Sequence, residues 1–515
     1  MQLNFDYLLN TMKNALLLAL FMFVGLNLAF CQWTSPGNGT VYTMHDLLEA
    51  SQGCVTYEDT LSAYLIHSNL TITANDCLKV TETDCLNTNC DAIGIYSVGN
   101  ILITIQGSIN IDNEKLRVYF LPFTESNHLR FAMENSTTPS FFKNTTFYET
   151  SGIQINESAV RFDSCYFQNT SMGYQRGAIT YKNCDPVLND CIFQGNYGPA
   201  LYSDGESKGS PQITRCEFRY NVLSKENMPQ LDLGPGGEDT IRIVNSRVLG
   251  LYPLVGGIRI ADTMQAGDTK ILLKGNFIGD NRYGFLQQGY AIESFITDNE
   301  IICSNMYESD PMTGGWGINI IGATNDCKAI IRHNLIKNNL WGITIHDNAV
   351  ADLGTEENHG DNRIFNNHNN CDSTDRHYAL YVYGVNDVSA IGNYWGGTTE
   401  AFAESVIYHR PDLGEDIGLV TYSPILIVND WAVTAYKPSE STAFPNPTNG
   451  LVTLRVNQAE GFTYEVFNMM GQRVMNGHAN GQETVIDLGP FSTGIYAIAI
   501  KADHEKTFSF LRIIR

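Results

Sequence analysis

Basic residues are scarce in this chain. Lys and Arg together account for 32 of its 515 residues against 55 Asp and Glu, so the formal net charge is -23. A domain that binds nucleic acid presents clustered positive charge to the phosphates, so we expect no DNA or RNA partner. Only 17% of the residues are charged. This balance is typical of the solvated surface of an exported protein, with calcium binding as the more specific alternative.

Long apolar runs are also missing, apart from one near the N-terminus. Lys13 precedes an apolar stretch over residues 15–28, and Ala29-Phe30-Cys31 provides small residues at the spacing of a cleavage site. This arrangement predicts a secretory signal peptide over residues 1–31. The stretch is short for a spanning helix and no later stretch is long enough, so we expect no transmembrane segment in the mature chain.

The chain contains twelve cysteines, which favour disulfides if it is exported. Cys77, Cys85 and Cys90 lie close together, with Cys54 upstream, and this group could tie a loop-rich cap. A zinc site there has less support, because the spacing is not the paired C-x-x-C pattern. Val41 to Ala50 reads as a short helix with Thr43 as its N-cap, a suitable device for covering the edge of a sheet.

The middle of the chain is a repeat of one short unit. Each unit has Cys, Ser or Asn, then a spacer, then an apolar residue, and most units end in a second Asn. Stacked coils of this kind bring equivalent residues about 4.8 Å apart, so inward positions form apolar ladders and turn Asn residues bond to one another. The units begin at Cys165, Cys191, Cys216, Ser246, Asn276, Asn299, Asn334, Asn362 and Asn393.

These repeats resemble those of right-handed parallel β-helix proteins of the pectate-lyase-like class. The resemblance covers about residues 90–425. It implies an all-β fold, a right-handed parallel β-helix solenoid followed by a small C-terminal β-sandwich. The expected organisation is a cap region at 32–90, the β-helix at 91–425, a linker at 426–440 and the C-terminal domain at 441–515.

Three cysteines stand in register where later coils carry Asn. Cys165, Cys191 and Cys216 would lie within disulfide range on adjacent coils. Because these positions point into the stack, where free Cys is a common small filler, we favour buried thiols over a bridge. Cys184 could pair with Cys191 or a neighbour.

The last seventy or so residues carry a separate signal. Short runs of alternating apolar and polar residues between Gly and Asn turns read as strands of a small β-sandwich. The unit opens with a rigid turn made by Pro445, Asn446 and Pro447 with Asn449 and Gly450. This pattern resembles the C-terminal sorting domain of the type IX secretion system of Bacteroidota. The resemblance implies export to the cell surface or outside, with the type IX secretion machinery as a partner.

One strand of each coil offers an outward column of side chains. In Gly257-Ile258-Arg259-Ile260 and its counterparts, the second and fourth residues face inward by strand alternation. The third residue of each segment and the residue two positions after it then point outward, and they suit a wet, aromatic, sugar-binding groove. The candidate binding residues are Arg259, Asn319, Thr344, His346, Tyr381 and Tyr383.

This column holds few carboxylates. A glycoside hydrolase needs an acid and a base across the sugar bond, and a calcium-dependent lyase needs several carboxylate oxygens beside a strong base. The acidic alternative is the loop between two coils, which also contains His359 and would form a calcium or acid-base site. Its candidate ligands are Asp347, Asp352, Glu356, Glu357 and Asp361.

Three tryptophans, Trp316, Trp341 and Trp395, are interpreted as packing residues first. Trp316 and Trp341 each precede a coil glycine, so they occupy matching positions that favour stacking over a binding platform.

The function hypothesis is an adhesin-like surface or secreted protein that binds a glycan or another polymer. The alternatives are a polysaccharide lyase or glycoside hydrolase, or a structural spacer.

Overall fold

The chain forms two compact units, residues 28–427 and a C-terminal unit from Val428 onward. The structure is a computed structural model. It describes residues 32–86, 91–113, 116–171, 176–306, 313–368, 377–427, 441–444, 450–456, 461–468, 473–492, 495–502 and 508–514. The predicted signal peptide, the linker from residue 428 and Pro445, Asn446, Pro447 and Asn449 lie outside these ranges.

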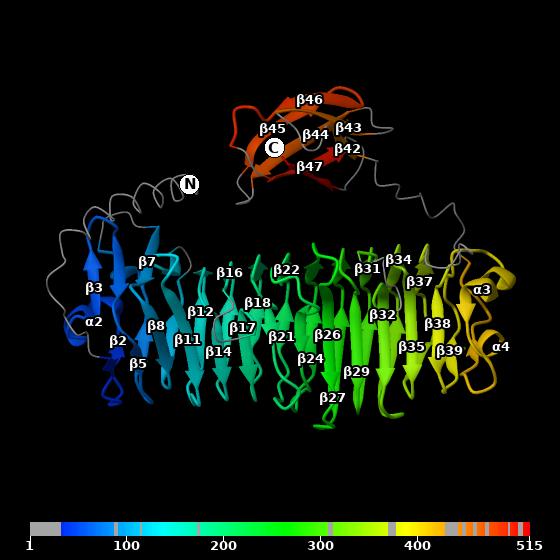
Figure 1. Cartoon of the computed structure of the whole chain (residues 1–515), viewed down its shortest axis with the longest axis horizontal. Coiled ribbons are helices and arrows are strands. Elements are labelled where there is room, and N and C mark those ends of the chain that lie inside the picture. Colours follow the sequence, from blue (N-terminus) through cyan, green and yellow to red (C-terminus); the bar gives the residue numbers. More distant parts are fainter. Residues whose placement is uncertain are drawn as a thin grey trace. The chain divides into compact units, whose positions relative to one another are not determined.

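The first unit is a right-handed parallel β-helix, as the repeats predict (Figure 1). Each full coil contributes one strand to sheet A, then one to sheet B, then one to sheet C. Parallel strands joined this way adopt the right-handed crossover that twisted strands favour. Among the described residues the three sheets contain 14, 14 and 13 strands.

The strands of sheet A are β1 (Trp33–Thr34), β5 (Leu70–Ile72), β8 (Asn100–Ile105), β11 (His128–Glu134), β14 (Ile153–Asn156), β17 (Ile179–Lys182), β20 (Leu201–Tyr202), β23 (Pro229–Leu233), β26 (Gly256–Asp262), β29 (Phe285–Gly289), β32 (Trp316–Gly322), β35 (Trp341–Asp347), β38 (Leu380–Gly384) and β40 (Ile407–Tyr408).

The strands of sheet B are β2 (Val41–Tyr42), β6 (Cys77–Lys79), β9 (Ser108–Ile111), β12 (Ser140–Lys143), β15 (Val160–Asp163), β18 (Val187–Asn189), β21 (Gln212–Thr214), β24 (Ile241–Val244), β27 (Thr269–Lys274), β30 (Ile292–Thr297), β33 (Lys328–Arg332), β36 (Val350–Gly354), β39 (Val388–Ala390) and β41 (Val420–Thr421).

The strands of sheet C are β3 (Val55–Glu58), β4 (Ala63–Ile66), β7 (Ala92–Ser97), β10 (Arg117–Pro122), β13 (Thr145–Tyr148), β16 (Tyr166–Gln168), β19 (Ile192–Gln194), β22 (Glu217–Arg219), β25 (Arg247–Leu249), β28 (Phe277–Gly279), β31 (Glu300–Ile302), β34 (Leu335–Lys337) and β37 (Arg363–Phe365).

Apolar ladders fill the interior of the stack. The inward column of sheet C includes Phe147, Phe167 and Phe193, whose rings stack at centroid distances of 4.9 and 4.4 Å. These side chains are at most 1% exposed, and Trp395 is buried at the same level in this core. Because each coil covers the apolar face of the next, the coils are stable only together.

A ladder of polar side chains closes the corner between sheets B and C. Asn334 accepts hydrogen bonds from the backbone and side-chain nitrogens of Asn299, and its own amide donates to Oδ1 of Asn362. Its Nδ2 also donates to the carbonyl of Ile296. The predicted Asn ladder is therefore confirmed, and it satisfies backbone groups that the turn would leave without partners.

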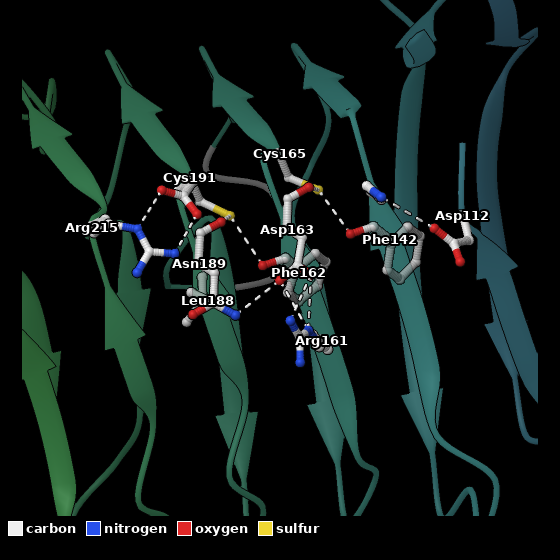
Figure 2. A network of polar contacts seen from close by, with 12 residues as sticks. Asp112, Phe142, Arg161, Phe162, Asp163, Cys165, Leu188, Asn189, Cys191 and Arg215 are labelled. Atoms are coloured by element: carbon white, nitrogen blue, oxygen red, sulfur yellow. Dashed lines mark hydrogen bonds and ion pairs between the residues drawn. The ribbon is translucent and has the colours of Figure 1, made fainter. Parts of the chain in front are cut away.

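Thiols perform the same task in earlier coils, where Cys165, Cys191 and Cys216 occupy the ladder position. Cys165 donates to the carbonyl of Phe142 at 3.3 Å, and Cys191 donates to that of Phe162 at 3.4 Å (Figure 2). All three are buried free thiols, which confirms the preference for thiols over a bridge, and Cys184 is also free.

The N-terminal region departs from the expected cap. Helix α2 (Met44–Ala50) forms as predicted, with the Thr43 hydroxyl accepting from the backbone of Asp46. However, strands before residue 91 already belong to all three sheets, so that residue is not a boundary of the helical stack. Cys85 is disulfide-bonded, whereas Cys77 is a free thiol. The remaining helices of this unit are η1 (Glu82–Asp84), α3 (Glu400–Val406) and α4 (Arg410–Leu413).

The C-terminal unit is the expected small β-sandwich. All its strand pairs are antiparallel, and its two sheets share a buried core that includes Val466 and Ile498. Gly450, the described member of the predicted turn, has a φ of +143°, which favours glycine. One sheet contains β42 (Ser441–Phe444), β43 (Leu451–Val456) and β46 (Glu483–Asp487), and the other β45 (Arg473–Ala479), β44 (Phe462–Asn468), β47 (Ile495–Ala502) and β48 (Phe508–Ile514).

Candidate functional site

The corners of the β-helix differ in length, and the longer ones border sheet A. Sheet B joins sheet C through only two residues from β15 to β34, for example Ser164 and Cys165 between β15 and β16. By contrast, the chain runs from Tyr202 to Gln212 between β20 and β21, and from Arg219 to Pro229 between β22 and β23. Loops on a rigid scaffold are where binding residues gather, so the outer face of sheet A is the candidate site.

One column of outward residues runs along this face, and we call it the outer column. Each member pairs through its Cα with the next, and the inward neighbours Ile258, Ile318 and Ile343 are fully buried. The register predicted for Arg259, Asn319, Thr344 and Tyr381 is therefore present, while their binding role stays a prediction. The outer column consists of Tyr202, Asp232, Arg259, Leu286, Asn319, Thr344, Tyr381 and Tyr408.

Asn319 and Thr344 lie opposite each other in this column and are unexpectedly buried. Each is 1% exposed, so the expectation of a wet surface is wrong at these two positions. Among the described residues, both amide atoms of Asn319 and the hydroxyl of Thr344 lack a hydrogen-bond partner. A buried polar group without a partner costs about 1–3 kcal/mol, and native proteins contain few of them.

His346 and Tyr383 are paired one step further along the same strands. Burial lowers the pKa of His346, against the opposing effect of Asp347, so its ring is neutral at physiological pH. Its Nε2 atom is buried and has no hydrogen-bond partner in the part of the chain that the structure describes. Tyr383 is 57% exposed, and its ring lies 6.2 Å from that of His346. These two residues thus provide an aromatic edge that solvent reaches.

Aromatic rings gather beside these polar atoms in a cluster that we call the aromatic patch. The ring centroids of Trp341 and Tyr381 lie 5.2 Å apart, and the ring of Tyr381 stacks on that of Tyr408 with a centroid distance of 6.0 Å. Trp316 and Trp341 are Cα partners on adjacent coils, as their matching sequence positions predict. The patch consists of Trp316, Leu340, Trp341, Tyr378, Tyr381 and Tyr408.

The other end of the outer column is charged. Nε of Arg259 donates to the carboxylate of Asp232 at 2.7 Å, and the Asp232 side chain is 4% exposed. Burial raises the pKa of Asp232, while Arg259 and Arg176 oppose the shift. Nη1 of Arg176 donates to the hydroxyl of Tyr202 at 3.2 Å, and its guanidinium lies over that ring. We call Arg176, Tyr202, Asp232 and Arg259 the arginine site.

Sequence analysis did not identify Asp232, Tyr202 or Arg176. The signal was present, because Leu231-Asp232 aligns with Ile258-Arg259 when the strand pattern is carried one coil back. Tyr283 was also missed. Its ring lies against Gly256, where a Cβ would come within 2.2 Å of it, and the absence of a side chain lets the ring approach the strand that carries Arg259.

The acidic loop does not converge in the structure. Asp347 ends β35 in sheet A, whereas Asp352 lies in sheet B and pairs with Arg332 at 2.7 Å. Glu356 and Glu357 are exposed, and Asp361 lies 3.7 Å from Nδ1 of His333. Within the described ranges, no group of three or more His, Cys, Asp or Glu side chains is arranged to hold a metal ion. A calcium site stays a prediction without structural support.

Comparison with known proteins identifies the C-terminal unit. Residues 442–514 match the family described as the secretion system C-terminal sorting domain. The chain is therefore exported by type IX secretion, to the cell surface or beyond, and the secretion machinery is its partner. Among the described residues, no helix is long and apolar enough to cross a membrane. No curated protein matches the chain in sequence.

Solved structures that resemble the chain include the periplasmic alginate epimerase AlgG. A single mutant of that enzyme is 10% identical, with a TM-score of 0.42 over 75% of this chain and 84% of that one. A double mutant is 9% identical, with a TM-score of 0.42 over 76% and 82% of the two chains. The unsubstituted enzyme is 10% identical, with a TM-score of 0.40 over 74% and 83%.

Proposed function

We propose that this exported β-helix protein binds an extended carbohydrate polymer along the outer column of sheet A, as an adhesin-like protein of a Bacteroidota cell surface. A polymer fits a repeated site, because each coil presents an equivalent position about 4.8 Å from the next. The predicted signal peptide and the sorting domain agree with a place outside the cell, where such polymers occur.

The observation that carries the proposal is the buried amide of Asn319. Its donor and acceptor lack partners within the described ranges, as does the neighbouring hydroxyl of Thr344. Because both residues are 1% exposed, a sugar reaches them only when the side chains that cover them move aside. Its hydroxyls can both donate and accept, so one sugar would then satisfy the amide and the hydroxyl together. The aromatic patch beside them offers ring faces on which the apolar face of a sugar packs.

Affinity electrophoresis of the exported full chain through gels containing plant, algal and host polysaccharides tests the proposal. We expect retardation by at least one polymer. The substitutions Asn319→Leu and Tyr381→Ala should each weaken it by about tenfold or more, the equivalent of one or two lost contacts. Phe295→Ala, which removes a 42% exposed ring from sheet B, serves as the control. Retardation unchanged by the first two substitutions would contradict the proposal.

A second candidate function, polysaccharide cleavage, is favoured by Asp232. A carboxyl with a raised pKa on a candidate binding face is suited to proton transfer. A glycoside hydrolase needs a second carboxyl across the sugar bond, and Asp232 is the one carboxyl in the outer column as described. Mass spectrometry of polymers after incubation decides between the two functions. Shortened chains that Asp232→Asn abolishes would establish cleavage, and unsaturated ends would indicate a lyase.

A further inference from the structure

The guanidinium of Arg259 is oriented by one hydrogen bond, which uses Nε and leaves its terminal N–H donors available to a ligand. Among the described residues, the Asp232 carboxylate accepts a hydrogen bond from Arg259 only at Nε, at 2.7 Å. The two terminal nitrogens of Arg259 have no hydrogen-bond partner among the described residues, and solvent reaches the side chain, which is 40% exposed. The buried carboxylate therefore fixes the fork of the guanidinium while its planar NH2 groups remain available on the outer face.

Arg176 adds a second available guanidinium on the adjacent part of the column. Its exposed side chain lies with Cζ 5.2 Å from the centroid of the Tyr202 ring, and Tyr202 is the Cα partner of Asp232. Two arginines against one aspartate leave this site with a net charge of +1. The chain as a whole carries -23, so the charge of this site is opposite in sign to that of the chain.

Arginine binds planar and tetrahedral oxyanions through paired N–H donors, which gives both energy and direction. We propose that the arginine site receives an anionic substituent of the bound polymer, a carboxylate or a sulfate ester, through Arg259 and Arg176. This inference rests on the proposed function and adds the chemical class of the ligand. In this arrangement Asp232 is a positioning residue that orients Arg259 toward the substituent.

The distance between the two ends of the outer column sets a length for the ligand. Arg259, Leu286, Asn319, Thr344 and Tyr381 occupy consecutive coils. Four steps of about 4.8 Å separate Arg259 from Tyr381 by about 19 Å. An oligosaccharide that contacts both the arginine site and the aromatic patch must span this distance, so affinity should rise when the ligand becomes long enough to reach both.

Two matched pairs of polymers test the inference with the exported full chain. Carrageenan is compared with chemically desulfated carrageenan for sulfate esters, and polygalacturonate with fully methyl-esterified pectin for carboxylates. We expect the acidic member of at least one pair to bind about tenfold more tightly than its neutral partner. Arg176→Gln and Arg259→Gln should each remove most of that difference.

Two further variants show whether an effect arises from the arginine site itself, from a general change in charge or from misfolding. Arg242→Gln removes an exposed positive charge from the outer face of sheet B and should have no effect. The double variant Asp232→Asn/Arg259→Gln keeps a neutral hydrogen-bonding pair and tests the site if Arg259→Gln alone does not fold.

Equal affinity for both members of each pair, or acidic binding that the arginine variants do not change, would overturn the inference. If either result is found but Tyr381→Ala still weakens polymer binding, the inference fails and the proposed function stands. No binding to any of the four polymers or to the wider panel would overturn both.

Discussion

Asp232 and Arg259 form a hydrogen-bonded ion pair across two coils, although their side chains differ widely in exposure, at 4% and 40%. Removing the two partners should therefore have opposite consequences. Arg259→Gln leaves a buried carboxylate without its charged partner and should destabilise the fold by about 2 kcal/mol. Asp232→Asn keeps an acceptor for Nε and removes the cost of burying a charge. Its melting temperature at neutral pH should equal or exceed that of the unsubstituted protein.

The pH dependence of this pair follows from the raised pKa of Asp232. The folded state binds the proton more tightly than the unfolded state, so the contribution of this group to stability grows as the pH falls and is lost as the pH rises through the folded pKa. The difference in melting temperature between Asp232→Asn and the unsubstituted protein should shrink as the pH falls from about 7 toward about 4. A difference that is constant across this range would contradict the raised pKa.

Ile343→Asp tests the inward register of sheet A. Ile343 is fully buried between Ile318 and Leu380 on the neighbouring coils. A carboxylate there has no partner, so we expect a loss of several kcal/mol, about 4 or more, and a lower midpoint of thermal unfolding. Val385→Asp introduces the same charge at a side chain that is 54% exposed and should leave the midpoint unchanged.

Thr344→Val separates stability from binding. Valine has nearly the shape of threonine and removes a buried hydroxyl that has no partner, so the free protein should become more stable by up to about 1 kcal/mol. Polymer affinity should fall in the same variant, because the hydroxyl is proposed to contact the sugar. Chemical denaturation and affinity electrophoresis give the two readouts. A variant that loses stability would show that the hydroxyl already has a partner in the free protein.

The thiol ladder should be inert in the folded protein. Burial raises the pKa of Cys191 and Cys216 well above the ordinary value, and Cys165 is equally buried. Iodoacetamide should leave these three residues unlabelled in the native state and label them after denaturation without a reductant, as read by peptide mass spectrometry. Cys77, which is partly exposed, is the internal comparison. Peptides that stay unlabelled until a reductant is added would indicate a bridge.

The sorting domain should control export without contributing to the β-helix. Deleting residues 442–515 should retain the protein inside the cell envelope, as shown by immunoblots of cell-surface and medium fractions. Ile498→Asp, in the core of the domain, should have the same effect, whereas Val485→Asp at a 62% exposed position should not. Secretion of the truncated chain at the normal level would contradict this role.

Much of this fold was predictable because its signal is repeated. The ladder position that holds Cys165, Asn276 and Asn334 recurs in each coil, so weak local preferences accumulate until the strand register is defined. The thiols follow from the same periodicity. The boundary expected at residue 91 failed because the earliest coils have irregular sequences, although their strands pair in the same three sheets.

The sequence by itself determined the stacked coils, the outward position of Arg259, Asn319 and Tyr381, and the sorting domain, because each depends on alternation or on a local pattern. The tertiary structure alone decided that Asn319 is buried without a partner and that Asp232 meets Arg259. It also dispersed the acidic loop over two sheets and an exposed turn. Burial and charge pairing arise between residues of different coils and loops, whose distances no spacing within one coil specifies.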